Sequence, residues 1–188
     1  MILSCTTCAL RQPGKDEIEE TLRHAPGAGF THWGLAGPLT WARQAISQID
    51  IPNLLERANA AGLTHITEVY AFSIPTDSVI EAEEAIDDLM LNVEAAIELN
   101  CPLVVFSGGK RTDGGLVPTI AGLKKLSDLI KGLPIKIGLE PHLRSQFQEA
   151  SDFDTIFTEI DSPQIGITVD TGHFHAAGVD WKAIIRQY

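Results

Sequence analysis

Two segments of the chain end in a carboxylate after the same alternation of residue types. Residues 135–140 and 165–170 each carry large aliphatic residues at alternate positions, and such residues share one face of a strand. Glu140 and Asp170 then lie on the other face, at the carboxyl end of their strands, where parallel barrels carry their active sites. Two carboxylates held together repel, and a divalent cation relieves the repulsion. The pair therefore predicts a metal site; the alternative is that both residues are strand-end caps solvated at a loop.

Histidines follow both carboxylates. His173 lies three residues after Asp170 and directly after Gly172, on a turn at the same end of the predicted strands. A neutral imidazole there can ligate a metal or donate a hydrogen bond to a substrate oxygen. The further candidates for contact with a substrate are His142, Arg144, His175 and Trp33. The tryptophan lies within a predicted strand and is equally consistent with a core position.

Short β-branched runs alternate with longer amphipathic stretches, which is the pattern of a parallel α/β fold. The clearest helix, residues 79–99, has an apolar stripe at helical spacing and follows a capping box formed by Ser78 and Glu81. The predicted strands are 2–9, 30–36, 64–72, 103–107, 135–140 and 165–170. The predicted helices are 15–25, 53–61, 79–99, 119–131, 153–160 and 181–188. These elements make six βα units, and we expect a single domain over residues 1–188 because no linker divides them.

Six βα units are compatible with two topologies. A complete (β/α) TIM barrel of eight units needs about 250 residues, so the barrel hypothesis implies that the last two units are missing from this chain. An open doubly wound sheet needs only six strands, but residues 10–15 lack the G-x-G-x-x-G phosphate turn. The barrel is therefore favoured. Its first and sixth strands would then be unpaired edges, which predict a homo-oligomer.

Three short motifs resemble those of a known family. Residues 138–142, 169–173 and 177–180 are similar to motifs of the xylose isomerase-like TIM-barrel superfamily. That superfamily includes sugar (phosphate) isomerases and epimerases, inosose dehydratases and AP endonucleases of family 2. The resemblance implies a divalent metal ion (Mn, Mg, Co or Zn) held by Glu140 and Asp170. It also implies that Glu140 is the acid/base in an enediolate reaction of a sugar or polyol and that His173 touches the substrate.

Two departures from the family pattern leave alternatives open. The family's remaining ligands, a histidine and a second glutamate, come from strands later than the six found here. Three interpretations therefore stay open: a truncated enzyme, a fragment completed by another chain, and a non-catalytic barrel that binds a polyol or a partner protein. The endonuclease branch carries histidine ligands near the ends of its third and fourth strands, and residues 70–73 and 105–108 contain none. An endonuclease-like hydrolase is the least favoured alternative.

Composition narrows the partners and the compartment. The formal net charge is −11, with a pI near 4.8, which argues against nucleic acid as the main partner. No apolar run approaches the roughly 20 residues of a membrane span. The first residues lack the basic region and apolar stretch of a secretory signal, so we expect a cytoplasmic protein. Cys5 and Cys8 have C-x-x-C spacing but no second pair, so reduced thiols are expected.

Overall fold

The computed structural model describes residues 1–188, in which six strands alternate with helices. The strands are β1 Ser4–Thr6, β2 His32–Ala36, β3 His65–Tyr70, β4 Leu103–Ser107, β5 Lys136–Glu140 and β6 Ile165–Ile167. The α-helices are α1 Glu17–His24, α2 Pro38–Trp41, α3 Ile51–Ala61, α4 Val79–Glu98, α5 Leu116–Ile130, α6 Ala150–Glu159, α7 Thr171–Ala176 and α8 Trp181–Gln187. Three short 3-10 helices are η1 Thr7–Leu10, η2 Pro26–Ala28 and η3 Ala45–Gln48.

The strands follow one another in chain order, from β1 to β6, in one parallel sheet. A doubly wound sheet reverses its strand order at a switch point, and this sheet has no reversal. The predicted α/β class is confirmed, and the strand order is that of an incomplete (β/α) barrel. None of the helices combines the length and the apolar character that crossing a bilayer requires.

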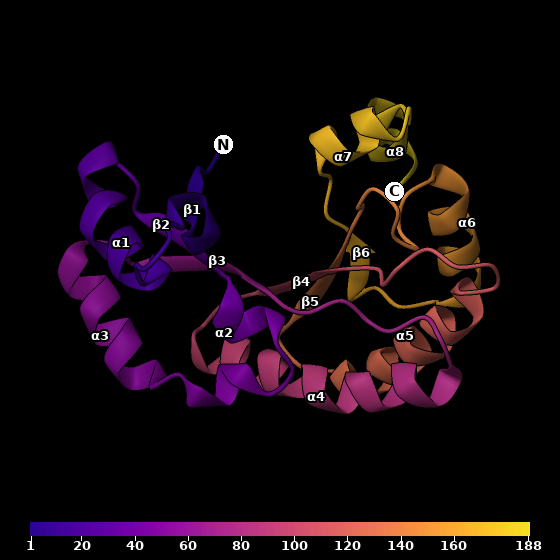
Figure 1. Ribbon diagram of the computed structural model, residues 1–188, viewed down its shortest axis with the longest axis horizontal. Helices are drawn as coiled ribbons and strands as arrows, with labels where there is room; N and C mark the ends of the chain where they lie inside the picture. The colour runs from indigo at the N-terminus through magenta and orange to yellow at the C-terminus, as the bar shows by residue number, and fades with distance from the viewer. The chain divides into compact units, whose positions relative to one another are not determined.

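The contacts divide the chain into two compact units (Figure 1). Unit 1 consists of Met1–Ala71 and Leu89–Val104, and unit 2 consists of Phe72–Asp88 and Val105–Tyr188. The chain passes from one unit to the other after β3, within α4 and within β4.

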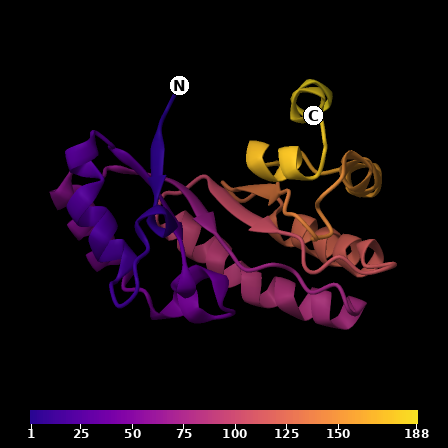
Figure 2. The ribbon, with the colours of Figure 1, turned by 45° about the horizontal axis from the view of Figure 1, so that its top comes forward.

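In unit 1, α1 and α3 lie side by side (Figures 1 and 2), joined by an ion pair between Arg57 and Glu19. Trp33 and Leu35 of β2 are buried in the core. The end of β2 is tied to η1, because the Thr7 hydroxyl donates to the Ala36 carbonyl at 2.6 Å and accepts from the Ala36 N–H at 2.9 Å. This double contact holds the segments that follow β1 and β2 next to each other.

In unit 2, four fully buried phenylalanines form a continuous aromatic cluster. The ring of Phe147 lies 6.3 Å from that of Phe106 and 6.2 Å from that of Phe153, and Phe153 meets Phe174 at 5.9 Å, edge to face. These residues come from β4, the loop after β5, α6 and α7. The cluster therefore fixes the loop after β5 and the helix α7, both of which carry candidate site residues.

The structure corrects the predicted bounds at both ends of the strand order. The first strand was predicted over residues 2–9, but β1 ends at Thr6 and the chain turns into η1, so Cys8 lies outside the strand. The sixth strand was predicted over 165–170, but β6 ends at Ile167. Two short helices, α2 and α7, were not predicted, because helices of four and six residues are too short to show an amphipathic period.

Gly138 and Gly166 are direct partners in the β5–β6 register and provide a matched test of strand packing. A Cβ at Gly138 would collide with the Thr168 hydroxyl, whereas a Cβ at Gly166 would meet nothing within 4 Å. We expect Gly138→Ala to lower the free energy of unfolding by about 1–3 kcal/mol, as overpacking does, and Gly166→Ala to leave it nearly unchanged. Urea denaturation measures both. Equal midpoints for the two variants would contradict the register.

Candidate functional site

Glu140 is the last residue of β5, and its side chain is only 15% exposed. Its neighbour Leu139 is buried, which turns the carboxylate to the other face of the strand. His142 follows two residues later and brings Nε2 to 3.9 Å from Oε2 of Glu140. The His142 backbone N–H donates to the Phe147 carbonyl at 2.9 Å. The histidine is therefore anchored to the aromatic cluster of unit 2.

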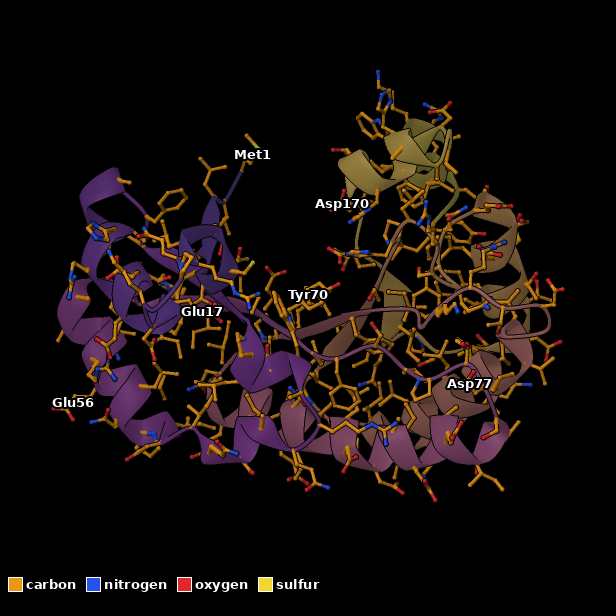
Figure 3. All side chains as sticks on the ribbon, in the orientation of Figure 1. Met1, Glu17, Glu56, Tyr70, Asp77 and Asp170 are labelled. Atoms are coloured by element: carbon orange, nitrogen blue, oxygen red, sulfur yellow. The ribbon has the colours of Figure 1, made fainter.

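Asp170 lies three residues beyond the end of β6 and is the N-cap of α7, where Figure 3 labels it. Its Oδ1 accepts the backbone N–H of His173 at 2.8 Å, which satisfies one of the unpaired donors at the start of a helix. The cap places His173 on the first turn of α7. One oxygen of Asp170 therefore caps α7. The second oxygen is available to a further ligand.

The rings of His142 and His173 meet with their centroids 3.7 Å apart and their planes inclined by 37°. The Leu143 N–H donates to Nδ1 of His173 at 3.4 Å. In a neutral imidazole, an Nδ1 that accepts leaves the proton on Nε2, so His173 presents an N–H donor. Burial and the neighbouring His173 lower the pKa of His142, against the opposing charge of Asp170. Both effects favour the neutral imidazole.

Unit 2 thus links two carboxylates through two imidazoles. The contacts run from Glu140 to His142, from His142 to His173, and from the His173 backbone to Asp170. Carboxylate and imidazole are donors suited to Zn²⁺ and Mn²⁺, so the residue types fit a divalent ion. No group of three or more such side chains is gathered closely enough to hold a metal. The metal role of the two carboxylates therefore stays a prediction.

The other predicted site residues are not gathered around this cluster. Arg144 is exposed at φ 65°, and its backbone N–H donates to Gln148. His175 is exposed on α7. Trp33 belongs to β2 of unit 1 and is 0% exposed, with an indole N–H that has no partner. Its side chain is part of the core and presents no surface to a ligand.

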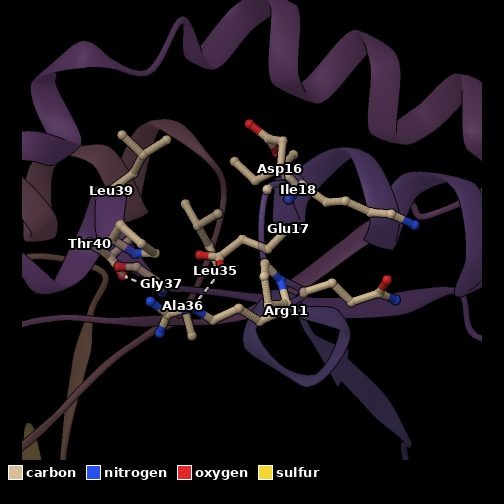
Figure 4. Close-up of a pocket in the computed structure, with 14 residues that line it drawn as sticks. Arg11, Asp16, Glu17, Ile18, Leu35, Ala36, Gly37, Leu39 and Thr40 are labelled. Atoms are coloured by element: carbon tan, nitrogen blue, oxygen red, sulfur yellow. Dashed lines mark hydrogen bonds and ion pairs between the residues drawn. The ribbon is translucent and has the colours of Figure 1, made fainter.

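A cavity of about 640 Å³ in unit 1 was not expected from the sequence (Figure 4). It is lined by residues 11–18, which follow η1, and by residues 35–40 at the carboxyl end of β2. Its charged side chains are Arg11, Lys15, Asp16 and Glu17. No motif marked these residues, because the cavity forms only when the two loops are brought together.

Glu17 is the most enclosed carboxylate of this cavity, with a side chain 14% exposed. It reaches across to Gly37 (Figure 4), whose backbone φ of 155° is one that other residues rarely adopt and where a Cβ would meet the Glu17 carboxyl group. Burial raises the pKa of Glu17, Arg11 at 3.8 Å opposes that rise, and Asp16 adds to it. A carboxyl group with a raised pKa in a cavity is a feature of functional sites.

The cap role of Asp170 can be separated from its charge. Asp170→Ala removes the acceptor for the His173 N–H and should lower the free energy of unfolding by about 1 kcal/mol. Asp170→Asn should retain most of that stability, because asparagine caps helices about as well as aspartate. Chemical denaturation of both variants measures the difference. An alanine variant as stable as the native protein would show that the cap contributes nothing.

The pKa of Glu17 predicts a pH-dependent stability. Because the folded-state pKa lies above the unfolded value of about 4.3, the folded protein holds this proton more tightly. The contribution of Glu17 to the free energy of unfolding is then favourable at low pH and is lost as the pH rises through its folded-state pKa. Glu17→Gln should therefore gain stability relative to the native protein as the pH rises above the unfolded pKa of about 4.3. Thermal unfolding as a function of pH measures it, with the exposed Glu56→Gln as the control. A gain that does not grow with pH would contradict the assignment.

Comparisons with solved structures agree with the fold. An L-ribulose 3-epimerase superposes with a TM-score of 0.75 at 18% identity, covering 100% of this chain and 66% of that one. The IolI protein, solved with a zinc atom, gives 0.68 at 18% identity, covering 96% and 66%. A fusion of a xylose isomerase-like TIM barrel with 4-hydroxyphenylpyruvate dioxygenase gives 0.74 at 17% identity, covering 98% and 29%. This chain thus spans about two thirds of the first two proteins and less than a third of the fusion.

No curated protein sequence matches the chain. The family model described as "Xylose isomerase-like TIM barrel" matches residues 22–187, which is most of the chain and includes both strand-end carboxylates. The strand order and the structural neighbours agree with this match. The chain belongs to the xylose isomerase-like TIM-barrel family.

Proposed function

We propose that this chain is part of a divalent-metal-dependent isomerase or epimerase of a sugar or sugar phosphate. The supporting observation is that Glu140 and Asp170 follow adjacent parallel strands, with the His142 and His173 rings in contact between them. Sugar epimerases among the structural neighbours favour this class of reaction. The substrate, its phosphorylation and the metal remain part of the proposal.

Each residue of the cluster has a role suited to moving a proton next to a carbonyl group. Glu140 is largely enclosed, and a positioned carboxylate can take and return such a proton. His173 has its Nδ1 occupied by the Leu143 N–H, so its Nε2–H is the donor for a substrate oxygen that gains negative charge.

The metal and its ligands complete the proposal. A bound divalent ion supplies positive charge that stabilises the enediolate form of the substrate. Glu140 and the free oxygen of Asp170 would hold it, so the capped oxygen stays with the His173 backbone. Arg144 and His175 remain candidates for substrate contact from the loop after β5 and from α7.

Exchange of the substrate's carbon-bound hydrogen with solvent tests the proposal. In D₂O with Mn²⁺, the native protein should introduce deuterium next to the carbonyl of a ketose such as L-ribulose or D-tagatose. Glu140→Gln should lower the rate by about 10²–10⁴-fold, the usual contribution of a positioned acid/base. NMR measures the deuterium, and removal of the metal with EDTA should abolish the exchange.

Glu159→Gln is the matched control, because Glu159 also belongs to unit 2 but is half exposed and pairs with Lys124 on the surface. It should exchange at the native rate. Metal-dependent exchange that survives Glu140→Gln unchanged would refute the role of Glu140.

A non-catalytic barrel that binds a polyol or a partner protein is the second candidate. Such a barrel needs no complete set of metal ligands, and no three such side chains are gathered in this chain. It predicts protection from thermal unfolding by a polyol without any metal-dependent exchange. An AP endonuclease of family 2 is also among the structural neighbours, but an endonuclease-like hydrolase is the least favoured candidate, because the net charge of −11 suits nucleic acid poorly. The homo-oligomer and the cytoplasmic location expected from the sequence remain predictions.

A further inference from the structure

Arg11 carries a positively charged side chain that is 53% exposed and makes no hydrogen bond within the chain. Its guanidinium lies over the ring of Trp41, with Cζ 5.4 Å from the ring centroid, and Trp41 in turn meets Tyr70 edge to face at 6.4 Å. The contact nearest to an ion pair is with Glu17, at 3.8 Å from Nε, which is beyond hydrogen-bond distance. A guanidinium that stacks on an aromatic face keeps its N–H edges available.

Three of the other arginines have their donors engaged in hydrogen bonds. Arg111 in unit 2 donates from both terminal nitrogens to the buried Asp152, at 2.7 and 3.2 Å. Arg23 and Arg57 donate to glutamates on α1. Arg11 differs because it lines a cavity of about 640 Å³ and makes no such bond. That volume is within the range of small-molecule sites.

The other charged groups that line the cavity are compensated. Lys15 pairs with Glu20 at 3.2 Å. Asp16 is the N-cap of α1, and its Oδ1 accepts two backbone N–H groups. Arg11 and Glu17 are thus the only charged groups in the cavity without a hydrogen-bonded partner.

Apolar side chains form the remainder of the wall: Ile18, Leu35, Pro38 and Leu39. They provide a surface for a carbon skeleton beside the charged pair. Glu17 faces the same space, and burial raises its pKa, which disfavours the negative charge beside Arg11.

We propose that this cavity binds the anionic group of a small molecule, a carboxylate or a phosphate, through the N–H edges of Arg11. Arginine matches the planar geometry of both groups with two parallel hydrogen bonds. The site belongs wholly to unit 1 and involves none of the residues of the proposed reaction.

Two pairs of probes that differ only in the anion test this site by isothermal titration calorimetry. D-gluconate is compared with sorbitol, and glycerol 3-phosphate with glycerol. At least one anion should bind at least tenfold more tightly than its neutral partner. The anion that binds more tightly identifies the group as carboxylate or phosphate. If neither anion exceeds its neutral partner, the proposal is overturned.

Variants of the charged pair sharpen the test. Arg11→Gln should remove anion binding, and Arg11→Lys should weaken it at least tenfold, because lysine keeps the charge and loses the two-pronged donor. Glu17→Gln should strengthen binding about two- to tenfold by removing the neighbouring negative charge. Arg23→Gln is the control and should bind as the native protein does. Circular dichroism verifies that each variant is folded.

Two results would overturn the proposal. One is unchanged anion binding by folded Arg11→Gln. The other is loss of binding in Glu17→Gln, which would make the carboxylate, and not the guanidinium, the group that recognises the ligand. The readout is binding and not turnover, so a failure here leaves the proposed isomerase or epimerase activity untouched.

Discussion

The hydrogen bond from the His173 N–H to Asp170 sets the position of half of the candidate site. It begins α7 three residues after β6, and the next residue of that helix, Phe174, enters the buried aromatic cluster. The cap and the cluster together place the His173 ring against His142. One oxygen of Asp170 is therefore committed to the backbone, and a bound ion would have to share this side chain with the start of a helix.

Two arginines, Arg111 of unit 2 and Arg11 of unit 1, are placed in different ways. In unit 2, Arg111 and the buried Asp152 form a bidentate pair, and Asp152 also accepts from two backbone N–H groups before α6. Such a pair fixes a loop. In unit 1, Arg11 has an aromatic face beneath it and an enclosed carboxylate beside it at 3.8 Å. Burial of Glu17 disfavours its ionised form despite this ion pair, and carboxyl groups with raised pKa values are enriched at functional sites.

The alternation of residue types predicted some features of the strands correctly and others wrongly. Alternation in residues 135–140 correctly places Ile137 and Leu139 in the core and turns Glu140 the other way. The same alternation extended the sixth strand too far, because Asp170 favours a helix cap that no strand period reveals. Trp33 was a candidate for sugar contact, yet it is fully buried, since β2 lies between β1 and β3 and the faces of parallel sheets are usually covered.

Periodicity along the chain was enough to identify the alternation of strands and helices and the parallel α/β class, because each depends on residues close in sequence. It also placed Glu140 at the end of its strand, whereas Asp170 lies beyond β6 as the cap of α7. Packing alone brought His142 against His173 and Arg11 over Trp41. These pairs are about 30 residues apart in the chain, and their contacts depend on loop conformations that no spacing rule describes. The cavity beside Arg11 is of the same kind, since its walls come from two loops that meet only after β1 and β2 have paired.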